Sequence, residues 1–327
     1  MNKRTSIKVA GILFISAILG TTVNAQERND VIKAYNEGAK AIQTDLPAAI
    51  KAFENAITLA DQVGETAQDL KDKAIKVLPG LYFKIAYNDL NEKKPAQEII
   101  EAAKKAAEVA DKYNSATNKD NAEKVLVQGY NILGSDYFTQ NEYDKAVMAF
   151  DSLLAINPDY LTAVYNKALV YLKQQNSEAF ETTIDLFLEK LKSGDNAERA
   201  QQASKMALEY FRAAGSQALQ ANNLDEALAM LNTATKYGED KDLYYFLSDV
   251  YNKKKDFDKG QEYAQKGLDL ETGDAEAKAK FYYQIATAQV GKGETSEACG
   301  SFKNAMYGAF AEASKAQRTN LKCKDGL

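Results

Sequence analysis

Residues 127–160 read VQGYNILGSDYFTQNEYDKAVMAFDSLLAINPDY, and the order of small, aromatic and polar residues in this stretch decides the fold. Gly134 is followed twelve residues later by Ala146, and Phe150 follows at sixteen. Small residues on two facing helices allow the backbones to approach closely, and Tyr130, one helical turn before Gly134, fills the groove beside them. The stretch therefore predicts a pair of short antiparallel helices.

The same spacing returns three more times along the chain. Small residues twelve positions apart occur as Gly215 and Ala227, Ser248 and Gly260, and Ala286 and Ala298. In each copy a polar residue is expected to cap the second helix, because its side-chain oxygen can accept amide hydrogens of the first turn; these residues are Asn141, Asn223, Asp256 and Thr295. One helix pair cannot bury its own apolar face, so stability must come from stacking of neighbouring pairs. The sequence therefore predicts an all-α repeat protein.

These residues resemble the tetratricopeptide repeat (TPR), whose unit of about 34 residues consists of a helix, a turn and a helix. Residues 127–160 carry its whole signature apart from the opening tryptophan and one alanine, where Leu153 stands. Weaker copies follow at 161–192, 208–241, 241–274 and 279–306, and two looser ones precede it near Gly38 and at 83–106. The resemblance implies a right-handed α-solenoid of about seven TPR-like repeats with a C-terminal capping helix.

The chain divides into four segments on this basis. Residues 1–25 are expected to be a signal peptide, 26–114 two loosely matching repeats, 127–306 an array of five repeats, and 307–327 the capping helix. Pro79 and Gly80 fall within an otherwise helical pattern, which predicts a kink or a break there.

The first residues have the composition of an export signal. Lys3, Arg4 and Lys8 precede the apolar run 9–19, and small and polar residues then lead to Ala25. This order predicts a secretory signal peptide that is cleaved after Ala25. The apolar run is too short for a permanent membrane span, and no cysteine near the cleavage point could accept a lipid. A soluble exported protein without an integral membrane segment is expected, and a retained N-terminal anchor is the alternative.

The charge of the chain bears on the kind of partner. Removal of residues 1–25 would leave 302 residues and change the net charge from -5 to about -8. A nucleic-acid backbone or an anionic membrane would require a clustered excess of lysine and arginine. The sequence therefore predicts a protein or peptide partner and no nucleic acid.

The two cysteines lie at the end of the array. Cys299 falls in the second helix of the last repeat, and Cys323 lies near the end of the amphipathic segment 310–322 that follows. In an oxidising compartment two cysteines suggest one disulfide; a metal pair and a reactive thiol are the alternatives, which the lack of histidine and of a third cysteine disfavours. The arrangement also resembles exported TPR proteins of Bacteroidetes-type Gram-negative bacteria, which implies the periplasm.

The composition argues against catalysis. Without histidine the chain lacks the commonest general base and the Ser-His and Cys-His couples. The acidic cluster Asp269, Glu271, Asp274 and Glu276 does not have the spacing of a calcium loop and falls between two repeats, where a polar turn is expected. The sequence predicts neither an enzyme nor a cofactor nor a metal site.

In the TPR family the first helices of successive repeats line a concave groove that accepts an extended peptide or a helix. By their place in the repeats, the residues that the resemblance places in this groove are Asn131, Ser135, Phe138, Tyr165, Asn166, Leu169, Arg212, Ser216, Tyr245, Asp249, Asn252, Tyr283 and Thr287. Three of them, Tyr165, Tyr245 and Tyr283, recur at the same place and would form a ladder of rings suited to holding a peptide. The alternative is that these rings only pack between adjacent helix pairs.

Two functions follow as hypotheses. The first is an exported scaffold or adaptor that binds a peptide segment or a partner protein in its concave groove, in cell-envelope assembly or secretion. The second is a carrier of a small molecule or glycan, which the absence of tryptophan disfavours. A long open channel would favour a peptide, and a closed pocket of drug-like volume would favour a ligand.

Overall fold

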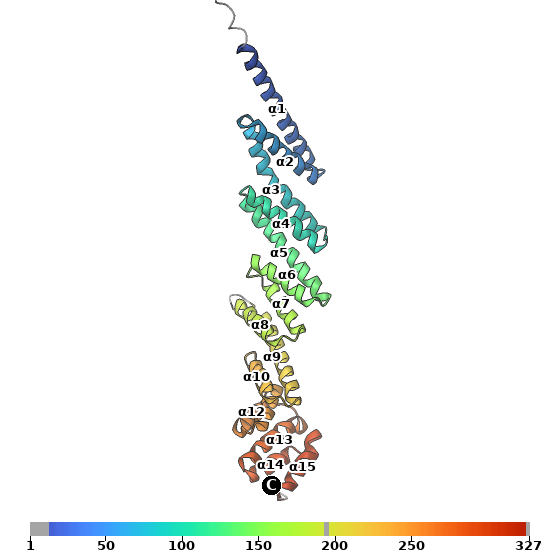
Figure 1. Ribbon diagram of the computed structural model, residues 1–327. Helices are drawn as coiled ribbons and strands as arrows, with labels where there is room; N and C mark the ends of the chain where they lie inside the picture. Colours follow the sequence, from blue (N-terminus) through green and yellow to red (C-terminus); the bar gives the residue numbers. More distant parts are fainter. Residues whose placement is uncertain (1–12, 193–195, 325–327) are drawn as a thin grey trace, which may run out of the picture. The chain divides into compact units, whose positions relative to one another are not determined.

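The computed structural model describes residues 13–192 and 196–324, with side chains from residue 26 onward (Figure 1). These residues contain no strand; their helices are α1 (Leu13–Ala41), α2 (Leu46–Val63), α3 (Gln68–Asn91), α4 (Ala96–Lys112), α5 (Ala116–Thr139), α6 (Tyr143–Ile156), α7 (Leu161–Lys173), α8 (Ser177–Leu191), α9 (Ala197–Gln220), α10 (Leu224–Thr235), α11 (Lys241–Lys253), α12 (Phe257–Leu270), α13 (Ala275–Lys292), α14 (Thr295–Asn304) and α15 (Ala311–Asn320). Short 3₁₀ helices lie at Glu65–Ala67 and Gly308–Phe310. The all-α fold of consecutive helix pairs is confirmed.

The expected signal peptide falls partly outside the described residues. Residues 1–12 fall outside the described residues, and α1 passes through the predicted cleavage point after Ala25. No helix in the described part of the chain is long and apolar enough to cross a membrane.

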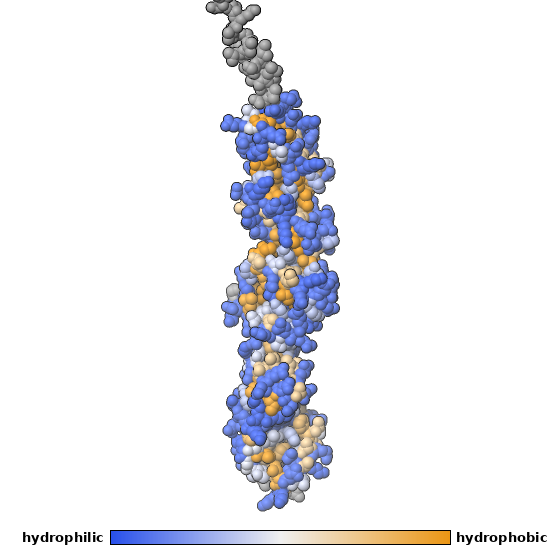
Figure 2. Space-filling view, viewed as in Figure 1, coloured by the Kyte–Doolittle hydropathy of each residue, from blue (hydrophilic) through white to orange (hydrophobic). Residues whose placement is uncertain are grey.

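Neighbouring helix pairs stack on one another within two compact units, Met1–Val170 and Tyr171–Leu327. In unit 1, α3 packs against both α2 and α4, and α5 against both α4 and α6. In unit 2, α11 and α13 take the same place between the second helices of successive pairs. The apolar core of unit 1 is accordingly a series of small clusters, which begins around Val31 and Ala34 and reaches Phe150 and Leu153. Hydrophilic residues cover most of the face that Figure 2 shows, with smaller hydrophobic groups among them.

The recurring spacing has a simple steric cause. A Cβ atom on Gly134 would lie 2.6 Å from a ring carbon of Phe150, and one on Gly215 would lie 2.6 Å from Leu231. The small residue of the first helix thus makes room for the bulky residue sixteen positions later in the second helix. Gly38 faces Phe53 in the same way, at 3.0 Å, which identifies the first helix pair as a copy of the pattern with one residue fewer in its turn.

In the third copy of the spacing, Ser248 and Gly260, different residues allow the two helices to pack closely. Ser248 is fully buried and its Oγ donates a hydrogen bond of 2.7 Å to the carbonyl oxygen of Gly260. A Cβ atom on Gly260 would lie 2.1 Å from Oδ1 of Asn252, a side chain that is only 6% exposed. The other copies have alanine at this position, and here glycine is required because Asn252 occupies the space.

Gly260→Ala is therefore expected to lower the free energy of unfolding by about 1–3 kcal/mol, since Asn252 must leave its hydrogen-bonded position or the helices must separate. Urea unfolding followed by circular dichroism measures the effect. Gly300→Ala in α14 is the control, because a Cβ atom there meets no other atom within 4 Å. The control should raise stability by up to about 1 kcal/mol through helix propensity. Equal effects of the two substitutions would contradict the steric explanation.

The predicted helix caps are only partly correct. Asp256 caps α12 as expected and accepts a hydrogen bond from the amide of Lys259 at 3.3 Å. Asn223 precedes α10, but its side-chain amide donates to Glu226 instead. Asn141 and Thr295 were assigned wrongly. Asn141 has a φ of 60° and ends α5, because the left-handed residue after a helix belongs to that helix's C-terminal cap, and Thr295 is already inside α14.

Of the kink or break predicted at Pro79, the break does not occur. Helix α3 runs without a break from Gln68 to Asn91 and contains Pro79, which is buried. Proline lacks the amide that would bond to the carbonyl of Ile75, a loss that normally weakens a helix. Leu78 and Leu81, on either side of Pro79 and Gly80, are buried in the core, and this packing holds the helix together.

Candidate functional site

All thirteen predicted groove residues lie on first helices of pairs. In unit 1, α5 carries Asn131, Ser135 and Phe138, and α7 carries Tyr165, Asn166 and Leu169. In unit 2, α9 carries Arg212 and Ser216, α11 carries Tyr245, Asp249 and Asn252, and α13 carries Tyr283 and Thr287. Asn252 is buried and the other twelve are partly buried.

Four of these residues meet at one pocket in unit 2. The pocket has a volume of about 260 Å³ and is lined by Asp249, Asn252, Lys253, Tyr283, Gln284, Thr287, Val290, Phe302 and Gln317. Helices α11 and α13 provide most of this lining, Phe302 comes from α14, and Gln317 comes from α15. The groove prediction missed Lys253, Gln284, Val290, Phe302 and Gln317.

Buried amide groups connect the two helices that form the pocket. Nδ2 of Asn252 on α11 donates hydrogen bonds to the main-chain oxygen and to Oε1 of Gln284 on α13, at 3.0 and 2.9 Å. Burial raises the pKa of Tyr245, so the phenol remains neutral. This network fixes the spacing of α11 and α13 behind the pocket.

The pocket wall combines an aromatic surface with an ion pair. The ring of Tyr283 contacts Phe302 with centroids 5.5 Å apart and Phe310 with centroids 5.3 Å apart. The carboxylate of Asp249 pairs with the ammonium of Lys253 at 2.9 Å. Oγ1 of Thr287 donates to the main-chain oxygen of Tyr283 at 2.8 Å. The pocket can therefore take an apolar side chain and offers polar groups beside it.

The three tyrosines of the expected ladder have different roles. Tyr283 lines the pocket, whereas the ring of Tyr245 packs edge-on against Phe281, 6.2 Å away, with the ammonium of Lys280 above it at 5.4 Å. Tyr245 therefore acts mainly in packing. Tyr165 belongs to unit 1.

Other predicted groove residues are engaged in local contacts. Arg212 forms an ion pair with Asp240, which also caps α11. Oγ of Ser135 donates to the main-chain oxygen of Asn131 at 2.8 Å, and the ring of Phe138 lies 6.1 Å from that of Tyr143. The side-chain oxygen of Asn131 is buried and has no hydrogen-bond partner among the described residues.

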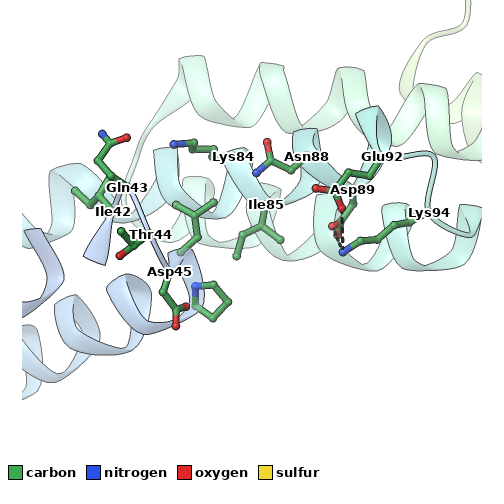
Figure 3. Close-up of a pocket in the computed structure, with 12 residues that line it drawn as sticks. Ile42, Gln43, Thr44, Asp45, Lys84, Ile85, Asn88, Asp89, Glu92 and Lys94 are labelled. Carbon is green, nitrogen blue, oxygen red and sulfur yellow. Dashed lines mark ion pairs between the residues drawn. The ribbon is translucent and has the colours of Figure 1, made fainter. Parts of the chain in front are cut away.

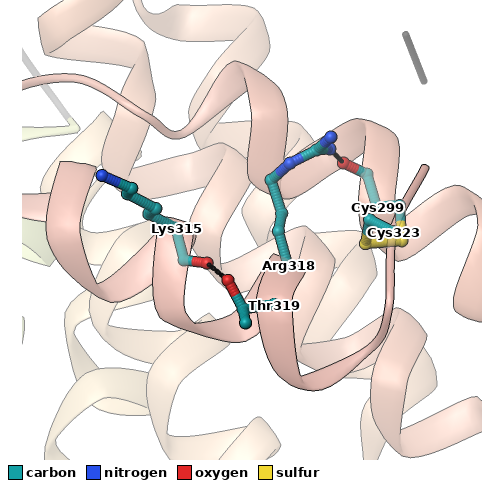
Figure 4. Close-up of a disulfide and its surroundings, with 5 residues drawn as sticks. All are labelled: Cys299, Lys315, Arg318, Thr319 and Cys323. Carbon is teal, nitrogen blue, oxygen red and sulfur yellow. Dashed lines mark hydrogen bonds between the residues drawn. A yellow bond between two sulfur atoms is a disulfide. The ribbon is translucent and has the colours of Figure 1, made fainter. Parts of the chain in front are cut away.

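A disulfide bond joins Cys299 on α14 to Cys323 after α15, as the cysteine positions predict (Figure 4). The guanidinium of Arg318 on α15 also donates a hydrogen bond to the main-chain oxygen of Cys299. Leu321 packs on the cluster of Ala286, Ala298 and Phe302. The segment after the last helix pair therefore caps the apolar end of unit 2.

The acidic cluster between α12 and α13 has a structural role. Glu271 is 6% exposed, pairs with Lys241 at 2.8 Å and accepts a hydrogen bond from the amide of Gly273. The Lys241 pair holds the pKa of Glu271 below its usual range. Asp274 caps α13 by accepting from the amide of Ala277. The described residues contain no group of His, Cys, Asp or Glu side chains that could hold a metal ion.

Unit 1 has a larger and shallower cavity of about 440 Å³ (Figure 3). The turn between α1 and α2 forms one side, and the end of α3 presents Lys84, Asn88 and Glu92 on the other. Buried Asp89 pairs with Lys94 at 2.6 Å at its edge. Because its lining contains no aromatic ring, the cavity offers less to a peptide side chain than the pocket in unit 2.

Comparison with solved structures aligns the chain with proteins of low sequence identity. The crystal structure of MamA protein is 20% identical over 62% of this chain and 97% of that chain, with a TM-score of 0.34. A tetratricopeptide repeat protein from Parabacteroides merdae is 19% identical over 91% of this chain and 99% of that chain, with a TM-score of 0.28. YrrB, described as a TPR protein with an unusual peptide-binding site, is 16% identical over 59% and 91%, with a TM-score of 0.34. The curated proteins give no match.

The family comparison agrees with the repeat pattern and with the observed helix pairs. The tetratricopeptide repeat model matches residues 133–196 and 212–275. The first match begins next to Gly134 and the second begins at Arg212, so each includes one of the small residues that admit a bulky partner. Residues 133–196 and 212–275 are therefore tetratricopeptide repeats.

Proposed function

We propose that the protein is an interaction scaffold that binds an extended segment of a partner protein along α11 and α13, with one apolar side chain in the pocket of unit 2. The observation that carries the proposal is the convergence of Asp249, Asn252, Tyr283 and Thr287 on this pocket. These residues were placed in the groove from the repeat pattern alone, and two consecutive first helices supply them. First helices of this family form the surface that accepts peptides.

The size of the pocket favours a peptide over a small-molecule or glycan carrier. Its volume of about 260 Å³ lies below the range of roughly 300–1,000 Å³ of small-molecule sites. Such a volume suits one side chain of a longer ligand. The carboxylate and the ammonium in the lining, Asp249 and Lys253, are paired with each other, so we propose binding and not catalysis.

The cellular setting in this proposal rests on the sequence of the first 25 residues. Their order of basic, apolar and small residues, together with the disulfide, supports export to the periplasm and a role in cell-envelope assembly or secretion.

Selection from a random peptide library displayed on phage tests the binding function. Peptides enriched on the immobilised full chain are expected to lose about tenfold or more in affinity for Tyr283→Ala, because the pocket wall loses its central ring. Tyr307→Ala is the matched control, since Tyr307 is 47% exposed and lies outside the pocket lining. Fluorescence anisotropy with labelled peptides measures the affinities. A library that yields no peptide dependent on Tyr283 would refute the proposal.

A further inference from the structure

One wall of the pocket in unit 2 comes from outside the repeats. Gln317 belongs to α15, which follows the last helix pair, whereas the rest of the lining comes from α11, α13 and α14. Gln317 is partly exposed and lines the pocket. An amide carries both donors and an acceptor, which is the complement of a peptide main chain.

Helix α15 cannot hold Gln317 in place by itself. It has only 10 residues, and Ser314 is its one buried residue. Isolated helices of this length are unstable in water, so the position of α15 depends on contacts with the rest of unit 2.

Helix α15 is attached mainly to α14 and to the residue that follows it. Oγ of Ser314 donates to the main-chain oxygen of Ala305 at a long 3.4 Å, and Arg318 donates to the main-chain oxygen of Cys299. The covalent contact is the bond from Cys299 to Cys323, which lies just after the end of α15 (Figure 4). The disulfide is thus the covalent tether of this wall, and it acts beside these hydrogen bonds and the packing of Leu321 on Ala286, Ala298 and Phe302.

We propose that α15 is part of the peptide site, that Gln317 contacts the bound peptide, and that the disulfide positions this contact, so that reduction of the bond weakens binding. This inference rests on the proposed function of the same pocket. It assigns the cap a role in recognition in addition to covering the end of the array.

The chemical step is thiol–disulfide exchange with a dithiol. One thiolate of the dithiol attacks Sγ of Cys323, which is more exposed than Cys299, and Cys299 leaves as a thiolate that takes up a proton. The second thiol of the reagent then attacks the mixed disulfide and releases Cys323 as a thiol. Two electrons pass to the protein, and the dithiol is oxidised to a cyclic disulfide.

The test uses a labelled peptide from the phage selection and the full chain. Treatment of the wild type with dithiothreitol is expected to raise the Kd by about tenfold, because α15 is then less well fixed before the peptide binds. Gln317→Ala with the disulfide intact should raise it by about fivefold through loss of hydrogen bonds to the peptide. Circular dichroism of the reduced protein shows whether the helices remain.

Two controls separate the wall from general effects. Lys315→Ala alters an exposed residue of the same helix whose side chain points away from the disulfide, and should leave the Kd unchanged (Figure 4). The double variant Cys299→Ser, Cys323→Ser should bind like the reduced wild type and should not respond to dithiothreitol.

The possible results distinguish the role of α15 from the proposed peptide binding on which it rests. A peptide that depends on Tyr283 but binds equally after reduction and to Gln317→Ala overturns the role of the cap and leaves peptide binding intact. A library without any Tyr283-dependent peptide overturns both.

Discussion

Gly134→Leu is expected to lower the free energy of unfolding by about 1–3 kcal/mol through overpacking between α5 and α6. Even a Cβ atom at this position would lie 2.6 to 2.8 Å from three ring atoms of Phe150, well inside van der Waals contact. Phe150 is 1% exposed and packs among Val127, Ala146 and Leu153, so its ring has no free space to enter. Urea unfolding followed by far-ultraviolet circular dichroism measures the loss.

Asp136→Leu provides the control, because Asp136 lies on the same helix and its side chain is exposed. That substitution adds a leucine without adding volume to the core, and stability should change by no more than about 0.5 kcal/mol. If Gly134→Leu unfolded at the same urea concentration as the wild type, that result would contradict the close packing of α5 against α6 at this position.

Loss of the Cys299–Cys323 bond is expected to destabilise the end of unit 2 by about 3 kcal/mol in the chain-entropy estimate. The bond closes a loop with a sequence separation of 24 and restricts the unfolded chain. The double variant Cys299→Ser, Cys323→Ser shows this loss in urea unfolding under oxidising conditions, with the wild type as reference.

Urea unfolding is then repeated in dithiothreitol. The free energy of unfolding of the wild type should fall to that of the double serine variant, and that of the variant should not change. Thiol titration of the unreduced wild type should find no reactive cysteine. Two reactive thiols, or a variant as stable as the oxidised wild type, would show that the bond does not support the cap.

The fold could be predicted because the repeat pattern records a local steric relation. Gly134 and Phe150 belong to one helix pair, so their compatibility is visible within a short stretch of sequence. The path of α3 through Pro79 could not be predicted in this way. It depends on burial of Leu78 and Leu81 against other helices, which a local rule about proline does not include.

The site could be predicted only where a repeat determines it. Asp249, Asn252, Tyr283 and Thr287 follow from their positions relative to Ser248 and Ala286, and the pocket brings them together. Phe302 follows Ala286 by sixteen residues, the spacing of Phe150 after Gly134, but it lies on a second helix and so outside the predicted groove. Gln317 has no repeat position at all, because α15 is placed by a covalent bond and by packing on α14.

The buried hydrogen bonds of Asn252 have a consequence for how unit 2 opens. They join α11 to α13, while Ser248 joins α11 to α12 and the disulfide joins α14 to the segment after α15. Local unfolding proceeds in contiguous cooperative blocks, and helices that share buried bonds belong to the same block. The last two helix pairs should therefore exchange their amide hydrogens as one group, so that the proposed peptide surface opens as a whole.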